Sequence, residues 1–294
     1  MHEERRGSTL EQDAARPTAA RHGDPAETDG DVTVRDGPSD VAEGLVVDGV
    51  TVRFGGIVAL DSARLEARPG EITGLIGPNG AGKTTLFNCL TGIYRAQAGS
   101  IRWRGQELLG LQPHVVAQHH VARTFQNLAL FPRLSVRENV VVGLHRVRRS
   151  DWLSNAFRAP WVLREEREVR ERADAALEEV GLAGVAARPA AGLPYGTLKR
   201  VELARAIASD PDLLLLDEPA AGLTHGEVDE LMELVRQLRE AHDLTVVLVE
   251  HHMGLVMRLC DHVTVLNFGR TIAAGPPAAV SSDPAVIEAY LGAA

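Results

Sequence analysis

The sequence contains only two cysteines, Cys89 and Cys260, among 294 residues. Each lies in an apolar stretch, so both are expected to be buried small side chains, and a disulfide framework is not supported. We therefore expect a reducing compartment, hence the cytoplasm. The sequence also lacks any run of about 18 consecutive apolar residues, which predicts that no segment spans a bilayer.

Basic residues are in short supply, and the formal net charge is −9. Proteins that bind nucleic acid irrespective of sequence need a basic surface, so no nucleic-acid partner is expected. Much of the acidity lies in residues 1–43, where eleven Asp and Glu stand against five Arg. This segment lacks an apolar run for a core and the apolar region of a secretory signal. We predict a disordered acidic tail over 1–43 and a folded domain over 44–294.

Against these absences stands one glycine-rich segment, residues 77–85, which fits the phosphate-loop pattern G-x-x-x-x-G-K-[ST]. Glycines let successive backbone N–H groups point inward at phosphate oxygens. Lys83 is expected to reach the β- and γ-phosphates, and the Thr84 hydroxyl to ligate Mg²⁺. The residues predicted to bind the nucleotide here are Gly77, Pro78, Asn79, Gly80, Ala81, Gly82, Lys83, Thr84 and Thr85. The sequence thus predicts that a nucleoside triphosphate is bound with Mg²⁺.

The apolar pattern from residue 44 onward alternates between strands and helices. Strands are predicted at 45–53, 59–67, 71–76, 99–105, 213–216 and 244–249, and helices at 164–180, 198–209 and 226–241. The first two strands suggest an antiparallel hairpin, and the later alternation of strand and helix indicates a mostly parallel sheet. The predicted fold class is therefore α/β: a P-loop core, an N-terminal antiparallel β subdomain and a helical insertion at about 127–200.

Two acidic residues follow the apolar strand 213–216. A P-loop enzyme holds Mg²⁺ through an Asp at such a strand end, and Asp217 has that place. Glu218, directly after it, is positioned to polarise an attacking water. Taken alone, the pair is equally compatible with an acidic helix cap, because carboxylates favour helix N-termini. Together with the phosphate loop, the pattern favours the catalytic interpretation.

Gln126 and His251 become candidate site residues only in combination with these motifs. Gln126 follows an apolar stretch, where a glutamine is normally a surface residue, but here its amide could ligate the metal or the water. His251 follows a buried strand, and its imidazole could bond a γ-phosphate oxygen, although such a histidine is more often a loop residue. The other histidines considered (His114, His119, His120, His252 and His262) are expected in surface or core roles, because they lack metal-ligand spacing with a thiol or carboxylate.

Five motifs occur in the order and at the spacing typical of ABC-transporter ATP-binding subunits. They are Gly77–Thr85, Gln126, Leu193–Arg205, Leu213–Glu218 and His251. The chain resembles that family over about residues 44–293. It is more closely similar to importer subunits for branched-chain amino acids and related amides and polar solutes. That second likeness rests on Arg123-Thr-Phe-Gln126, Asp217-Glu-Pro-Ala-Ala-Gly-Leu223, Val249-Glu-His251 and Ala289-Tyr-Leu-Gly292.

The resemblance implies roles that the residues alone do not supply. Phe54 would stack on adenine, Gln126 would link the metal site to the helical subdomain, and His251 would sense the γ-phosphate. Tyr195 and Gly196 would belong to the signature loop, which contacts ATP bound by a second ATP-binding subunit. The implied partners are that subunit, as a homodimer or heterodimer, integral-membrane permease subunits and an external solute-binding protein. The chain would hydrolyse ATP on the inner face of the membrane.

The signature loop departs from the family pattern Leu-Ser-Gly-Gly-Gln. Residues 193–197 read Leu-Pro-Tyr-Gly-Thr, so a serine hydroxyl and, at Pro194, a backbone N–H are missing as donors to phosphate. The rival interpretations are a soluble ABC-type ATPase acting on DNA or ribosomes and a small-molecule kinase. The first usually carries a coiled-coil insert or two cassettes, and the second does not need residues 193–205.

Overall fold

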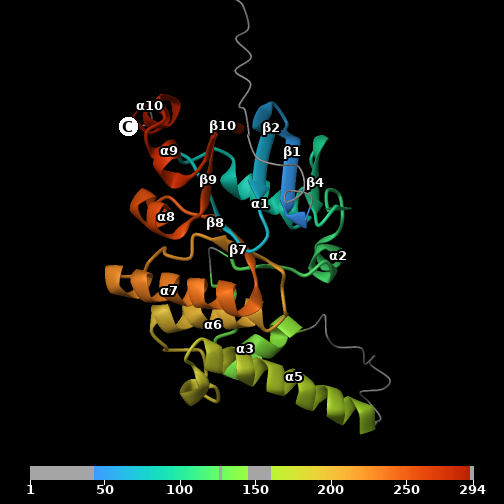
Figure 1. Cartoon of the computed structure of the whole chain (residues 1–294). Helices are drawn as coiled ribbons and strands as arrows, with labels where there is room; N and C mark the ends of the chain where they lie inside the picture. Colours follow the sequence, from blue (N-terminus) through green and yellow to red (C-terminus); the bar gives the residue numbers. More distant parts are fainter. Residues whose placement is uncertain (1–42, 126–127, 145–159, 292–294) are drawn as a thin grey trace, which may run out of the picture. The chain divides into compact units, whose positions relative to one another are not determined.

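The computed structural model describes residues 43–125, 128–144 and 160–291, with side chains from residue 164 in the last range (Figure 1). The predicted tail over 1–43 therefore lies almost wholly outside the described residues, as does Gln126. Across the described ranges, no helix combines the length and the apolar character needed to cross a bilayer.

A four-stranded antiparallel sheet forms the N-terminal part of the described chain. Its strands are β1 (Leu45–Phe54), β2 (Ile57–Ala67), β4 (Ala98–Trp103) and β5 (Gln106–Glu107), in the order β2-β1-β4-β5. β1 and β2 pair from Leu45 opposite Ala67 to Phe54 opposite Ile57, with a two-glycine turn between them. The predicted hairpin and antiparallel subdomain are confirmed.

A six-stranded sheet forms the core. Its strands are β3 (Ile72–Ile76), β6 (Val121–Arg123), β7 (Leu213–Asp217), β8 (Thr245–Val249), β9 (His262–Asn267) and β10 (Arg270–Gly275), in the order β10-β9-β3-β8-β7-β6. All pairs are parallel except β9 with β10. Every residue of β3, β7 and β8 is buried. Such continuous apolar strands are expected where both faces of a parallel sheet are covered.

Helices cover this sheet and extend beyond it. The described helices are α1 (Lys83–Leu90), α2 (Pro113–Gln118), α3 (Val136–Gly143), α5 (Pro160–Glu179), the 3₁₀ helix η3 (Ala183–Val185), α6 (Tyr195–Ile207), α7 (His225–His242), α8 (Met253–Leu259), α9 (Pro277–Ser281) and α10 (Pro284–Leu291). Leu214 and Leu216 of β7 belong to the core shared with α6 and α7. Leu213 and Leu215 point to the opposite core, which contains residues of α1 and the antiparallel sheet.

The predicted helical insertion contains α3, α5 and α6, which lie side by side in Figure 1 and contact one another. The stripe predicted on α5 and just beyond it is buried along its whole length. It consists of Val169, Ala173, Ala176, Leu177 and Val180. Gly181 follows with a positive φ of 74°, as expected for a glycine that ends a helix.

The predicted start of α6 at Leu198 is wrong by three residues, because the helix begins at Tyr195. Pro194 is its N-cap residue, and the Pro194 carbonyl accepts the Leu198 N–H at 3.1 Å. The missing proline N–H costs the helix nothing at this position, because the N-cap N–H donates no intrahelical hydrogen bond. Gly196 consequently lies inside the first helical turn instead of in a preceding loop.

The strand register brings the predicted site residues together. Val249, the last residue of β8, lies opposite both Leu75 of β3 and Asp217 of β7. The three strands run parallel, so the loops that follow them leave the sheet at the same level. These loops contain the phosphate loop, Glu218 and His251. In open α/β sheets this carboxyl edge is where ligands bind.

Candidate nucleotide-binding site

The phosphate loop joins β3 to α1, and two of its glycines have no room for a side chain. A Cβ on Gly77 would lie 2.1 Å from the Leu266 carbonyl oxygen. Gly82 has φ of 104°, and a Cβ on this residue would lie 2.7 Å from the Ala59 carbonyl oxygen. The loop is therefore pressed against β9 and β2, and only glycine backbone fits there. Gly82 is also the N-cap of α1, so the free N–H groups of that helix face the loop.

Lys83 is the first residue of α1, and its side chain bends back over the loop. Its Nζ donates to the carbonyl oxygens of Gly77 at 2.7 Å and Pro78 at 3.0 Å. Burial lowers the pKa of Lys83 below its ordinary value, while the carboxylates of Glu218 and Asp217 act in the opposite direction. The ammonium is therefore bound to the phosphate loop and close enough to the two acidic residues predicted from sequence for their charges to act on it.

Asp217 ends β7 and is held by an arginine. Its Oδ2 accepts a hydrogen bond from Arg123 Nη2 at 2.6 Å, and both side chains are less than a tenth exposed. Arg123 also donates through Nη1 to Asn88 Oδ1 at 2.8 Å and to Thr91 Oγ1 at 3.1 Å. A charged, multiply bonded guanidinium of this kind fixes the carboxylate direction. The Asp217 N–H, in turn, donates to Thr124 Oγ1 at 3.3 Å.

Glu218 has a backbone conformation that residues other than glycine seldom adopt, with φ of 48°. Its N–H donates to the Val249 carbonyl oxygen at 3.0 Å, which fixes the turn after β7. Left-handed conformations cost roughly 1–2 kcal/mol per non-glycine residue and concentrate at functional sites. Glu218 is half-buried, and the next helix, α7, begins only at His225, so Glu218 lies outside the cap of that helix. The alternative of a simple helix cap is thereby weakened.

Phe54 lies at the end of β1 and is 46% exposed. Its ring meets Tyr94 edge to face, with centroids 5.1 Å apart and an interplanar angle of 71°. Tyr94 follows α1, so the aromatic pair joins the antiparallel sheet to the segment after the phosphate-loop helix. Two partly exposed aromatic rings of this kind form a platform on which a planar base can stack.

Tyr195 and Gly196 lie in the first turn of α6, next to the start of α7 and the segment before it. A Cβ on Gly222 would lie 3.1 Å from the Tyr195 ring, and one on Gly196 would lie 2.8 Å from Glu227 Oε1. Glu227 is bound to the N–H and hydroxyl of Thr224 in the capping box of α7. The predicted signature segment is thus tied to residues of its own chain that follow Glu218.

His251 lies just after β8 with its side chain about half exposed, and it is not isolated. Its Nδ1 lies 3.8 Å from Glu250 Oε2, and the Nδ1 of His252 lies 3.5 Å from the same oxygen. His252, expected in a surface or core role without a carboxylate at metal-ligand spacing, thus lies close in space to the Glu250 carboxylate. Three consecutive residues do not match the usual spacings of metal motifs, but the bend after a strand lets their side chains converge.

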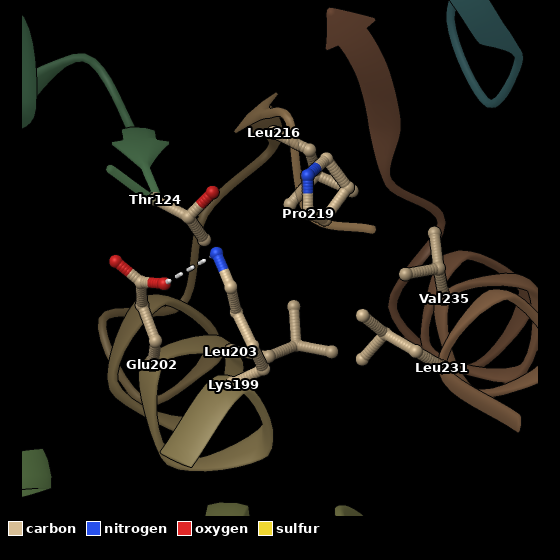
Figure 2. Close-up of a pocket in the computed structure, with 8 residues that line it drawn as sticks. All are labelled: Thr124, Lys199, Glu202, Leu203, Leu216, Pro219, Leu231 and Val235. Atoms are coloured by element: carbon tan, nitrogen blue, oxygen red, sulfur yellow. Dashed lines mark ion pairs between the residues drawn. The ribbon is translucent and has the colours of Figure 1, made fainter. Parts of the chain in front are cut away.

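A small cavity lies between α6, α7 and the segment after β7 (Figure 2). It is lined mainly by apolar side chains, and none of its lining residues belongs to the phosphate loop, so it is separate from the predicted nucleotide site. On its wall, Glu202 Oε2 lies 3.9 Å from Lys199 Nζ, and Glu202 Oε1 accepts the Phe125 N–H at 2.9 Å. Burial raises the pKa of Glu202, whereas the Phe125 N–H and Lys199 lower it.

With this geometry in place, comparisons with known proteins identify the family. The family model for ABC transporters matches residues 60–221, which is more than half of the chain. The chain belongs to the ABC transporter family. A second model, for branched-chain amino acid ATP-binding cassette transporters, matches residues 270–294. As a member of this ATPase family, the chain binds and hydrolyses ATP.

Several curated ABC proteins match this chain over nearly the whole of their own length. The high-affinity branched-chain amino acid transport ATP-binding protein BraF of Pseudomonas aeruginosa is 46% identical over 250 residues, covering 85% of this chain and 98% of BraF. LivG of Escherichia coli K12, which has the same description, is 45% identical with the same coverage. A probable LivG of Methanocaldococcus jannaschii is 32% identical over 257 residues, covering 86% of this chain and 99% of that protein.

Solved structures of ABC cassettes show the same fold. A nucleotide-free ATP-binding cassette from an ABC transporter matches with a TM-score of 0.74 and 31% identity, covering 84% of this chain and 98% of that one. The ADP conformation of an ATP-binding cassette matches with a TM-score of 0.74 and 32% identity, covering 85% and 99%. The predicted α/β fold class is confirmed.

Sequence reasoning missed three residues that the structure places beside the ABC motifs. Arg123 was noted only as part of a subfamily likeness, although a charged residue in a buried strand is itself a signal. Tyr94 carried the weaker signal of an aromatic residue shortly after the phosphate-loop helix. Glu202, which is 2% exposed, lies in the motif that begins at Leu193. Its contact with the Phe125 N–H could not be read from the sequence, because 77 residues separate them.

Proposed function

We propose that this chain is the ATP-hydrolysing subunit that powers an importer for branched-chain amino acids or closely related polar solutes. The observation that carries this is the identity of 45–46% to BraF and LivG over 98% of their length. The match of residues 270–294 to the branched-chain amino acid transporter model adds independent support. The interpretation as a soluble ATPase acting on DNA or ribosomes is not supported.

Residues 77–85 bind the triphosphate through backbone N–H groups at the start of α1. Lys83 exchanges its bonds to the Gly77 and Pro78 carbonyls for the β- and γ-phosphates. This exchange replaces neutral acceptors with charged ones, which form stronger hydrogen bonds. Phe54 stacks on adenine, supported by its contact with Tyr94. Such stacking buries ring surface on both partners and does not depend on which base is bound.

The oxygen donors at the end of β7 and the start of α1 fit Mg²⁺. Thr84 is an exposed residue in the first turn of α1, and the Asp217 carboxylate is held by Arg123. Hydroxyl and carboxylate oxygens, together with water and phosphate, are the ligands that Mg²⁺ takes in nucleotide sites. When bound, Mg²⁺ would neutralise charge on the β- and γ-phosphates. We propose Thr84, Asp217 and Gln126 as the residues that hold it.

Hydrolysis requires that a water be aimed at the γ-phosphate. Glu218 is the general base in this proposal, since it directly follows Asp217 and its carboxylate is near enough to Lys83 to raise the pKa of that lysine. His251 hydrogen-bonds a γ-phosphate oxygen and so distinguishes ATP from ADP. Gln126 connects the metal site to the helical subdomain. Each role uses a residue at the carboxyl edge of the parallel sheet, or next to it in the chain.

The complete site needs a second ATP-binding subunit. Tyr195 and Gly196 of each subunit contact the γ-phosphate held by the other, so two ATP molecules lie between two subunits. Loss of the γ-phosphate contacts then opens the pair. Integral-membrane permease subunits bind this pair on the cytoplasmic face, and an external solute-binding protein delivers the solute. Nucleic acid is not a partner.

Reconstitution with the membrane subunits tests this proposal. The chain should co-purify with integral-membrane partners, and ATP should drive uptake of radiolabelled leucine, isoleucine or valine into proteoliposomes. A Glu218→Gln complex is the matched control and should assemble without transport. Uptake of none of the branched-chain amino acids, amides or urea would contradict the proposed class of solute, and failure to bind any membrane partner would contradict the proposed role in an importer.

A further inference from the structure

Three consecutive residues after β8 carry metal-ligating side chains that converge. Glu250 is fully buried, whereas the side chains of His251 and His252 are 47% and 59% exposed. One ligand atom from each of the three residues lies within 4.8 Å of the others. The cluster stands beside the proposed catalytic residues, but its carboxylate and second imidazole have no part in the proposed ATP hydrolysis.

The backbone fixes the Glu250 carboxylate in this cluster. The Ala220 N–H donates to Oε1 at 3.0 Å, and the His251 N–H donates to Oε2 at 3.2 Å. Ligating carboxylates in metal sites are commonly oriented by such outer hydrogen bonds. Among the described residues, Glu250 forms ion-pair contacts with the two imidazoles and with no Lys or Arg. A buried carboxylate is ordinarily paired with a strong cation or coordinated to a metal.

The two imidazoles are arranged so that both can turn toward this carboxylate. Their ring centroids are 4.1 Å apart with an interplanar angle of 39°, and each Nδ1 already lies on the Glu250 side. Zinc bonds of about 2.0–2.2 Å place tetrahedral ligand atoms roughly 3.3 Å apart. The observed separations of 3.5 and 3.8 Å from Oε2 require only small rotations of exposed rings.

We propose that Glu250, His251 and His252 form a binding site for a divalent transition-metal ion of the Zn²⁺ class. Two imidazole nitrogens and one carboxylate oxygen favour Zn²⁺ over Mg²⁺, which prefers oxygen donors alone. The exposed side of the rings leaves a fourth position for water. A bound ion holds the imidazole of His251, so that this ring is withdrawn from the γ-phosphate. This inhibitory consequence rests on the proposed role of His251, whereas binding itself does not.

The first test measures metal binding to full-length, tag-free protein without nucleotide. Co²⁺ serves as the probe, because tetrahedral coordination gives intense visible absorption. We expect one Co²⁺ per chain, displaced by Zn²⁺. His252→Ala should weaken binding at least tenfold, the size of effect expected for a lost ligand or its support. The matched control is His242→Ala, which removes another histidine that contacts a carboxylate, at 2.6 Å from Glu179.

Equal Co²⁺ affinity and equal spectra for the wild type and His252→Ala would overturn the site. Glu250→Gln, with folding checked by circular dichroism, provides a second variant in which the same spectrum should be lost. The activity arm then uses buffered Zn²⁺ at fixed MgATP. The wild type should be inhibited, whereas His252→Ala should keep its basal rate and resist Zn²⁺. Binding without inhibition would uphold the site and overturn the inhibitory consequence.

Discussion

Arg123 Nη2 lies 2.6 Å from Asp217 Oδ2, and the two side chains form a buried ion pair. The guanidinium is flanked by the rings of Phe87 and Phe125, at 5.5 and 5.4 Å from their centroids. Since Arg123 also binds the last turn of α1, the pair ties the end of β7 to the helix that begins at Lys83. The position of the proposed metal-binding carboxylate thus depends on a residue of β6.

Arg123→Met should destabilise the protein by about 3–5 kcal/mol, because it leaves the Asp217 carboxylate buried without a partner. Adding Asp217→Asn to this variant removes the unpaired charge and should restore much of the loss. Urea unfolding of the wild type, both single variants and the double variant measures the coupling. If the double variant is no more stable than Arg123→Met alone, the ion pair does not explain the effect.

Glu218→Gln should preserve ATP binding and reduce turnover by about 10²–10⁴-fold, the usual contribution of a general base. The amide keeps the size of the side chain but cannot accept the proton of water. ATP-bound dimers should therefore accumulate, as measured by size-exclusion chromatography with ATP. Turnover near the wild-type rate would exclude Glu218 as the base.

Gly196→Asp should abolish ATP-driven dimerisation and hydrolysis, while the monomer still binds ATP. The added Cβ would lie 2.8 Å from Glu227 Oε1, and the new carboxylate would repel both Glu227 and a partner-bound phosphate. Gly196→Ala adds the same Cβ without charge and is the matched control for the steric part. Dimerisation is best measured in the Glu218→Gln background. A Gly196→Asp protein that dimerises normally would contradict the signature role of this turn.

The lowered pKa of Lys83 predicts two opposite trends at alkaline pH. Between the folded-state pKa and the ordinary value of 10.5, the unfolded chain binds more protons than the folded chain, so this group makes stability rise with pH. ATP affinity should fall over the same window, because the neutral amine attracts phosphate weakly. Lys83→Met should show neither the rise in stability nor the fall in ATP affinity that this lysine causes. Unfolding and nucleotide binding measured across the same pH range test this. An affinity midpoint at or above 10.5 would show that burial does not control this lysine.

Both thiols should resist modification in the native protein. Burial raises the pKa of Cys89 to about 11 and that of Cys260 to about 12, so little thiolate is present at pH 8. A thiol-reactive disulfide reagent should label neither cysteine under native conditions and both in guanidinium. Rapid native labelling of either residue would reveal local opening of the core at that position.

The sequence predicted those elements whose pattern is local. β7 and β8 were recognisable as runs of buried residues, and the stripe on α5 followed from helical spacing alone. Parallel strand order then placed the phosphate loop, Asp217 and His251 at one edge. By contrast, 94 residues separate Arg123 from Asp217, and single-sequence periodicity contains no information about such a pair. The start of α6 was misplaced because Pro194 and Gly196 suggest a loop unless the cap geometry is known.

The edge-to-face contact of Phe54 and Tyr94 has a consequence for nucleotide specificity. Aromatic rings attract any base through its flat surface and do not distinguish the hydrogen-bonding groups at its rim. If the base stacks on these rings as proposed, the cassette recognises the triphosphate through many hydrogen bonds and hardly distinguishes one base from another. GTP should therefore drive the same cycle as ATP, and the nucleotide used in the cell would be set by relative abundance.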